Sequence, residues 1–360
     1  MKILPLSDLR RRHSRRGSSL LLVFWLVAMM GMLIYSATVV VSQDLEMTKS
    51  QKQAFRARQL AEMGLNIAMN PVVKESDFGL LNQGPGVENT VMLPLLMQLE
   101  EGEMVSVKIK GEGGRININA LLQSGEKGRQ GFHYLLSAWG VPDDKGSDLG
   151  HDAIFDHLVD WTDADSTSAG LHGMEKDEYQ ALFGETTPYP FNRPFYDLDE
   201  LLLVPGFEQV SAVVGDFRDY FTIYSAGVGI DPDQAEAKVL AAVVMMLKSS
   251  EPDAADFEKA KEDAQEILSM KFGADGLEDT EDDVKIDQAT ALSSLGLQAD
   301  DGPAGGFTAS ELIGSTDQTV HIQSDATVGE YRKRVVLIVR NRTGTPQILT
   351  RKEIPLFENK

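Results

Sequence analysis

Acidic side chains gather in one short stretch of this chain, where Asp160, Asp163 and Asp165 stand at positions i, i+3 and i+5. Two glycines follow them before the next acid, Glu175. Calcium takes six to eight oxygen ligands in flexible geometry, so carboxylates clustered in a loop suit this ion. Three carboxylates so close repel one another unless a cation or a basic partner is present. A helix end followed by a solvated acidic loop has the same pattern, and the residues alone leave both interpretations open.

A second acidic loop lies further along the chain, in residues 273–283. Carboxylates beside glycine in a loop again suit calcium, and a flexible acidic loop without metal is the alternative. The candidate ligands in this loop are Asp275, Asp279, Asp282 and Asp283.

The other residues that could do chemistry form no pattern typical of an enzyme. The chain has no cysteine, which excludes disulfides, a thiol nucleophile and a cysteine-ligated zinc site. His151, His157 and His172 lie close in sequence, but spacings of six and fifteen residues fit no standard zinc motif. The sequence also has no nucleophile–base motif, P-loop or dinucleotide fingerprint. We therefore expect no enzymatic activity.

The charge is divided between a short basic N-terminus and an acidic body. Residues 1–17 contain six basic residues and one acid, whereas the whole chain has a formal net charge of −21. Such a body repels nucleic acid and suits divalent cations and basic partners. Residues 201–215 resemble a helix-hairpin-helix, a motif that can bind DNA phosphates, but Arg218 is the only basic residue nearby. We expect this segment to pack helices or to meet a protein partner, with no nucleic acid bound.

Residues 18–41 form an apolar segment of 24 residues without a charge. As a helix this segment spans about 36 Å, enough to cross a hydrocarbon core of about 30 Å. The arginine cluster of the leader lies wholly on its N-terminal side. The positive-inside rule therefore places the N-terminus in the cytoplasm and the residues after Val41 outside, behind a single-pass membrane anchor. A cleaved secretory signal is the alternative, but its apolar region would be shorter, about 7 to 15 residues, and would end at a clearer cleavage site.

The helical pattern continues beyond the apolar segment, without a proline before Pro71. Apolar residues recur at helical spacing in this part of the chain. They are Leu45, Ala54, Ala57, Leu60, Ala61, Leu65 and Ala68. The sequence therefore predicts one helix of about 50 residues, half in the membrane and half amphipathic outside it.

The body of the chain combines strands and helices. Residues 103–119 alternate apolar and polar side chains around a glycine-rich turn and predict a β-hairpin or strand pair. A second strand pair is predicted near the C-terminus, with its turn at Val328, Gly329 and Glu330. Between the two pairs, helices are expected over residues 131–140, 152–161, 198–220, 234–247 and 253–272. The fold class is therefore α+β, with a long N-terminal helix packed on a small antiparallel sheet and a large helical insertion domain.

The sequence resembles a known family of membrane-anchored fibre proteins. A basic leader that ends at Gly17, directly before a long apolar helix, is similar to the cleavage site of type IV pilin-like proteins. Those proteins mostly carry a glutamate five residues after the cut, where this chain has Leu22. Residues 158–207 are similar to the type II secretion minor pseudopilin K family (GspK). The residues that carry this similarity are Asp160, Trp161, Asp163, Asp165, Gly173, Glu175, Tyr179, Pro188, Tyr189, Asn192 and Leu201 to Gly206, with Arg115, Asn117 and Asn119 upstream.

The resemblance implies a pilin-like fold and two kinds of functional residue. Prepilin peptidase would cut between Gly17 and Ser18, and the new N-terminus would be methylated. Structural calcium would be held by Asp160, Asp163, Asp165, Glu175 and Asn192. In the family, the glutamate is thought to neutralise the terminal amine of the preceding subunit. Leu22 therefore fits a subunit that starts a fibre and has no predecessor, since an unpartnered charge in the bilayer is costly.

We therefore expect a minor pseudopilin at the tip of the type II secretion pseudopilus, which starts assembly for protein export across the outer membrane. Its expected partners are GspI- and GspJ-like minor pseudopilins, the major pseudopilin, prepilin peptidase and the inner membrane. A minor pilin or adhesion subunit of a related type IV pilus is the alternative. The expected division of the chain is 1–17 leader, 18–41 transmembrane half of the helix, 42–119 periplasmic helix and first strands, 120–312 helical insertion with acidic calcium loops, and 313–360 C-terminal strands.

Overall fold

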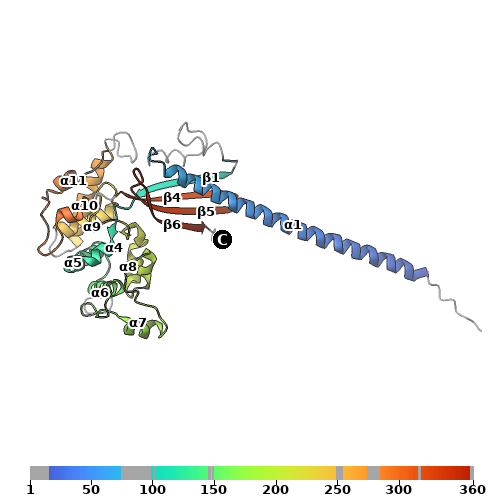
Figure 1. The fold of residues 1–360 in the computed structure, drawn as a ribbon, viewed down its shortest axis with the longest axis horizontal. Helices are drawn as coiled ribbons and strands as arrows, with labels where there is room; N and C mark the ends of the chain where they lie inside the picture. Colours follow the sequence, from blue (N-terminus) through green and yellow to red (C-terminus); the bar gives the residue numbers. More distant parts are fainter. Residues whose placement is uncertain are drawn as a thin grey trace, which may run out of the picture.

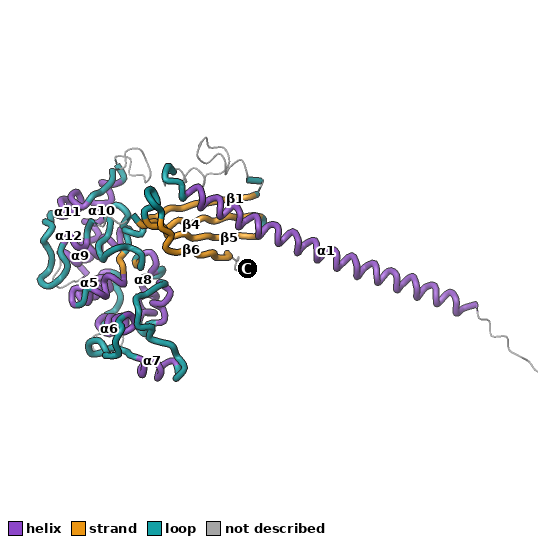
Figure 2. The backbone as a smooth tube through the Cα atoms, in the orientation of Figure 1, coloured by secondary structure: helices purple, strands orange, loops and turns teal. Residues whose placement is uncertain are grey.

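The computed structural model has a long helix at one end, a small sheet in the middle and a helical domain at the other end (Figure 1). It describes residues 16–73, 99–100, 102–144, 147, 150–248, 254–273, 284–314 and 318–356. The expected α+β class is confirmed, with the long helix lying against the sheet and the helices beyond it (Figure 2).

The first helix, α1 (Arg16–Ala68), is continuous over 53 residues. It is long and apolar enough to cross a membrane, and the apolar side chains of its first half are exposed. The C-terminal half differs, because Ala57, Leu60, Ala61 and Leu65 are buried at helical spacing against the sheet. Gly64 lies on the same face, where a Cβ atom would meet Ser324 Oγ at 2.3 Å. The two halves of α1 therefore differ, since the first exposes its apolar side chains and the second packs into a protein core.

The sheet has four antiparallel strands in the order β1 (Glu103–Gly111), β4 (Thr319–Val328), β5 (Tyr331–Arg340) and β6 (Gln347–Leu356). The predicted C-terminal strand pair is confirmed, since β4 and β5 form a hairpin that turns at Gly329 with φ of +59°. Side chains from β1, β4 and β5 form one core with α1.

The predicted hairpin in residues 103–119 is wrong. β1 pairs with β4, more than 200 residues away in sequence, and Gly111 stands opposite Val320. The next strand, β2 (Ile116–Asn117), instead runs parallel to β3 (Phe221–Thr222). The glycine-rich segment between them lies against Gln234, because a Cβ on Gly114 would be only 2.1 Å from the Gln234 carbonyl oxygen. The chain therefore leaves the sheet here instead of turning back along it.

The helical domain surrounds its own core, separate from the core under α1. Its helices are α4 (Ile118–Gln123), α5 (Glu126–Ala138), α6 (His151–Thr162), α7 (Lys176–Phe183), α8 (Phe207–Val214), α9 (Ala237–Lys248), α10 (Ala254–Lys271), α11 (Gln288–Leu295) and α12 (Ala309–Leu312), with 3-10 turns η1 (Leu198–Leu203) and η2 (Phe217–Asp219). Buried side chains run continuously along α9, which contacts α5 and α10. Because α9 is buried on all its faces over most of its length, it lies at the centre of this domain.

One predicted helix, over residues 198–220, is broken into η1, α8 and η2. Proline at position 205 and Gly206, with φ of +88°, end the first piece. Gly215, with φ of +82°, ends the second piece. The expected packing role is met by Phe207, Val210 and Phe217, which are fully buried in the helical core.

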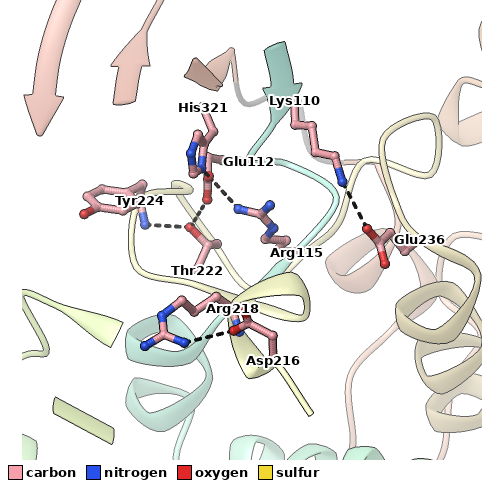
Figure 3. A network of polar contacts seen from close by, with 9 residues as sticks. All are labelled: Lys110, Glu112, Arg115, Asp216, Arg218, Thr222, Tyr224, Glu236 and His321. Carbon is pink, nitrogen blue, oxygen red and sulfur yellow. Dashed lines mark hydrogen bonds and ion pairs between the residues drawn. The ribbon is translucent and has the colours of Figure 1, made fainter. Parts of the chain in front are cut away.

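A buried carboxylate joins the sheet to the helical domain (Figure 3). Glu112 accepts hydrogen bonds from Arg115 Nη1 at 2.6 Å and from Thr222 Oγ1 at 2.6 Å, and His321 Nδ1 lies 3.3 Å from it. Thr222 belongs to β3 and His321 to β4, so the three partners come from both sides of the junction. Burial alone would raise the pKa of Glu112, but the bond with His321 and the charge of Arg115 outweigh burial and lower the pKa overall.

Candidate metal site between α6 and α7

The end of α6 and the start of α7 face each other across the loop of residues 163–175. Asp160 lies in the last turn of α6 and is fully buried, and Asp163 caps the end of that helix. Glu175 caps the start of α7, with Glu178 completing a capping box. The helix expected over residues 152–161 is therefore confirmed. Two helix ends bring carboxylates to one place.

A cluster of aromatic rings encloses one side of this site. Trp161 is fully buried, and the centroids of its ring and the Tyr189 ring are 5.2 Å apart. Phe195 stacks on Trp161 at 6.1 Å, and Tyr179 of α7 lies 5.8 Å from it. Rings at these separations pack without leaving room for water between them. The nearby carboxylates are therefore held in a partly dehydrated setting.

Two glycines bring the loop into contact with α6. A Cβ on Gly170 would lie 2.3 Å from Asp156 Oδ2, and one on Gly173 would lie 2.4 Å from Asp160 Oδ2. Asp156 Oδ2 accepts hydrogen bonds from the backbone amides of Leu171 and His172, both at 3.2 Å. Any larger residue at the two glycine positions would push the loop off the helix.

Asp156 is a residue that the sequence analysis missed. It is 1% exposed and is held by Arg129, whose Nη2 donates to Asp156 Oδ1 at 2.5 Å. The sequence spacing could have indicated Asp156, because Asp156 and Asp160 are four residues apart and therefore share one face of α6. Asp156 positions the loop, whereas Asp160 faces the other carboxylates.

Oxygens of Asp163, Asp165 and Glu175 lie within 4.8 Å of one another. Oxygens on opposite sides of a calcium ion are separated by about 5 Å, because each Ca–O bond is about 2.3–2.6 Å long. Within the part of the chain that the structure describes, Asp160 Oδ2, Asp163 Oδ1 and Glu175 Oε1 are buried without a hydrogen-bond partner. Buried carboxylate oxygens without donors are costly, and a cation would satisfy them. The donor set therefore fits calcium.

The electrostatics of the cluster agree with this fit. Burial, reinforced by the charges of Asp160 and Asp163, raises the pKa of Glu175 to about 7. Burial also raises the pKa of Asp160 to about 6, against the opposing hydrogen bond from the Ala169 amide. The pKa of Asp163 rises as well, through burial and the charge of Asp165. Each carboxylate is therefore unfavourable as an anion where it stands, until a positive charge joins it.

The remaining predicted site residues fall in different places. Asn192 donates from Nδ2 to the backbone oxygen of Asp165 at 2.8 Å, so its amide nitrogen supports the loop beside the three-carboxylate cluster. Gly17 and Ser18 lie in the first turn of α1. The second acidic loop, with Asp275, Asp279, Asp282 and Asp283, lies outside the described residues.

The three histidines singled out in the sequence do not meet. His157 Nδ1 is 2.9 Å from the carbonyl oxygen of Pro205 and thereby fixes α6 to the turn before α8. His151 lies at the opposite end of α6 from Asp160 and is buried beside His133. His157 therefore packs α6 against a neighbouring turn, and the unsuitable spacing of these histidines for a zinc motif agrees with their separation in the fold.

Comparisons with known proteins point to one family. Residues 114–224 match the model of the family described as type II secretion system (T2SS), protein K. This chain is 28% identical over 191 residues to the type II secretion system protein K of Pseudomonas aeruginosa. The aligned region covers 52% of this chain and 50% of the relative. The aligned part therefore spans about half the length of that relative.

A solved structure has the same fold. The crystal structure of the GspK-GspI-GspJ complex from the enterotoxigenic Escherichia coli type 2 secretion system contains a chain that matches with a TM-score of 0.51 and 16% sequence identity. The match covers 85% of this chain and 99% of that chain.

The long apolar helix packed on a small antiparallel sheet gives this chain the pilin-like fold that the sequence predicted. The three comparisons agree on type II secretion system protein K, and the resemblance predicted from the sequence is confirmed.

Proposed function

We propose that this chain is a minor pseudopilin at the tip of the type II secretion pseudopilus, where it starts assembly for protein export across the outer membrane. The observation that carries this proposal is the shape of the molecule. The exposed apolar half of α1 and the helical domain lie at opposite ends of the sheet (Figure 1). In a fibre built from stacked long helices, a domain of this size above the sheet leaves no room for a further subunit.

Leu22 supports the position at the start of the fibre. It stands five residues after Gly17 and is exposed on the apolar part of α1. Subunits inside a fibre need a carboxylate there to meet the amine of the subunit before them, and a first subunit has no such neighbour. Leucine then avoids the cost of an unpaired charge in the bilayer.

Before assembly, α1 anchors the chain in the inner membrane with its N-terminus in the cytoplasm and its main domain in the periplasm. The hydropathy and length of α1 support the anchor, and the basic leader supports the orientation. Prepilin peptidase then cuts between Gly17 and Ser18, and the new N-terminus is methylated.

The partners along the fibre are GspI- and GspJ-like minor pseudopilins, followed by the major pseudopilin. Beyond the membrane half, α1 still exposes large apolar side chains, namely Leu45, Met47 and Phe55. Unpartnered apolar residues on a helix that otherwise packs into a core are suited to contact the helices of neighbouring subunits.

Calcium has a structural role in this proposal. Held by Asp163, Asp165 and Glu175, with Asp160 beside them, the ion ties the end of α6 to the start of α7. It replaces the disulfides that a chain without cysteine cannot form. The melting temperature of the purified chain should fall when a chelator removes calcium and return when calcium is added back. An unchanged melting temperature would refute the structural role.

N-terminal analysis of the mature protein tests the pseudopilin proposal. In cells with active prepilin peptidase the chain should begin at Ser18, and in cells without the peptidase it should keep its leader. A chain that still begins at Met1 in the first strain would defeat the proposal. A strain that lacks this chain should also lose secretion, and the wild-type gene should restore it.

A further inference from the structure

A second group of metal-ligating side chains lies at the other end of α6, away from the carboxylate cluster. It consists of His133 on α5, Asp143 in the segment after α5, and His151, the first residue of α6. One ligand atom from each residue lies within 4.8 Å of the other two. These residues are 10 and 8 positions apart in sequence, so only the fold brings them together.

The ring of His151 is fixed in an orientation that suits a metal ligand. The residue is 1% exposed, and its Nε2 lies 2.9 Å from the carbonyl oxygen of Val141. A carbonyl oxygen can only accept, so Nε2 carries the hydrogen and donates it. In the neutral ring the lone pair is then on Nδ1, which faces His133. Histidines that bind metals characteristically donate their other ring nitrogen to a carbonyl or carboxylate in this way.

The two imidazoles are also at a suitable separation. Nδ1 of His133 and Nδ1 of His151 are 3.1 Å apart. Two nitrogens bound to one tetrahedral zinc ion, each at about 2.0–2.1 Å, lie about 3.4 Å apart. A hydrogen bond between the rings accounts for the same distance, so the third residue matters.

Asp143 is the third residue of this group and is itself held in place. Its Oδ1 accepts a hydrogen bond from the His151 backbone amide at 3.0 Å. A Cβ on Gly150 would lie 3.4 Å from that oxygen and 2.8 Å from the Asp144 carbonyl oxygen. The absence of a side chain at position 150 therefore lets the Asp143 segment close over the start of α6. A hydrogen bond between the two imidazole rings does not require a carboxylate beside them. The carboxylate of Asp143 supplies negative charge, which a bound cation does require.

We propose that His133, Asp143 and His151 form a separate site for a divalent transition metal, with Zn²⁺ as the ion that best suits two imidazole nitrogens and one carboxylate oxygen. Three protein ligands leave one tetrahedral position for water or for a partner's side chain. Calcium prefers oxygen ligands only, so the two ends of α6 select different ions. This site does not depend on the proposed role in the pseudopilus.

Zinc titration of the purified full-length chain tests the site. The metal-free protein is titrated with zinc chloride in millimolar calcium, which keeps zinc out of the carboxylate cluster. Calorimetry should give one zinc ion per chain, and Co²⁺ in its place should give the visible absorption of a tetrahedral site. His133→Ala should weaken zinc binding roughly tenfold or more, since it removes a ligand. His172→Ala, a histidine in the loop before α7, is the matched control and should bind zinc as the wild type does.

Asp143→Asn gives an independent reading if the alanine variant is unstable. Its amide oxygen can still accept from the His151 amide, but a neutral oxygen is a poor zinc ligand, so affinity should again fall while the circular dichroism spectrum stays the same. Equal zinc affinity in the wild type, His133→Ala and Asp143→Asn would overturn the proposal. So would a wild-type chain that binds no zinc, and in either case the two rings form only a hydrogen bond.

Discussion

Two buried acidic groups in this molecule have opposite surroundings. At the junction of sheet and helical domain, Glu112 is 2% exposed and receives hydrogen bonds from Arg115 and Thr222, with His321 beside it (Figure 3). Between α6 and α7, Asp160 and Glu175 are also buried but have oxygens without a partner among the described residues. The first group has its partners within the chain, whereas the second has buried oxygens that the proposed cation would satisfy.

The pKa values have the corresponding directions. The pKa of Glu112 is lowered, because its partners outweigh the burial that would raise it. The pKa of Asp160 is raised to about 6, because burial outweighs the hydrogen bonds from the backbone, and the pKa of Glu175 is raised to about 7, because burial is reinforced by neighbouring carboxylates. Burial of a carboxylate is thus no guide to its role, whereas the set of donors around it is.

The largest expected effect comes from breaking the junction. Glu112→Ala leaves the guanidinium of Arg115, which is mostly buried, without its anion, and should lower the free energy of unfolding by about 3–5 kcal/mol. Urea unfolding followed by circular dichroism measures this loss. Glu126→Ala is the control, since Glu126 is 87% exposed and 3.8 Å from Arg129, and it should change stability by less than about 0.5 kcal/mol. Similar losses in both variants would contradict the central place given to Glu112.

The second expected effect is on thermal stability, and its direction depends on whether calcium is present. The double variant Asp163→Asn, Glu175→Gln removes two charges that repel each other, so in chelator it should melt at or above the temperature of the wild type. With calcium at 100 times its dissociation constant, the wild type should gain about 2.7 kcal/mol of unfolding free energy, and the variant should gain little. Thermal melts under both conditions make the comparison. A variant that is less stable than the wild type in chelator would show that these carboxylates stabilise the fold without metal.

The close approach of the loop to α6 gives a third test. Gly173→Ala places a methyl group against Asp160 and the Ala169 backbone and should cost about 1–3 kcal/mol of stability. Gly227→Ala is the matched control, because nothing lies within 4 Å of the added atom. Thermal unfolding of both variants in calcium should separate them, and calcium affinity should fall for the first variant alone.

The smallest effect is a dependence on pH. As pH falls from about 7.5 to 5.5, Glu175 and then Asp160 take up protons, so calcium affinity should fall roughly tenfold or more.

Without calcium, a fall in pH has the opposite effect at this site, because it raises the stability of the fold. The folded chain holds these protons at a higher pH than the unfolded chain does, so their contribution to stability rises as pH falls from about 7 to 4. Glu112 behaves in the other way, since its lowered pKa gives stability that is present above pH about 4.3 and lost below it. Calorimetric titrations at several pH values, with Glu175→Gln for comparison, measure the first effect.

Local patterns predicted much of this molecule. Helical periodicity from Leu45 onward predicted α1, and the turn at Gly329 predicted the β4–β5 hairpin. The helix expected over residues 152–161 is α6, and the fold brings Asp163, Asp165 and Glu175 together beyond its end.

Contacts between distant segments could not be predicted in the same way. Alternation in residues 103–111 shows that a strand exists but not that its neighbour is β4, because pairing depends on the course of the whole chain between them. Proximity of His133, Asp143 and His151 depends in the same way on how α5 meets α6.

The exit and return of the chain at the sheet have an evolutionary consequence. The helical domain leaves from Gly111 and returns at Thr319, and the amide of the very next residue, Glu112, donates to the Thr319 carbonyl oxygen at 2.9 Å. Both ends of this large excursion thus meet at one edge of two adjacent strands. A short turn between those strands would close the sheet just as well. The helical domain is therefore an insertion whose size can change during evolution while α1 and the sheet keep their arrangement.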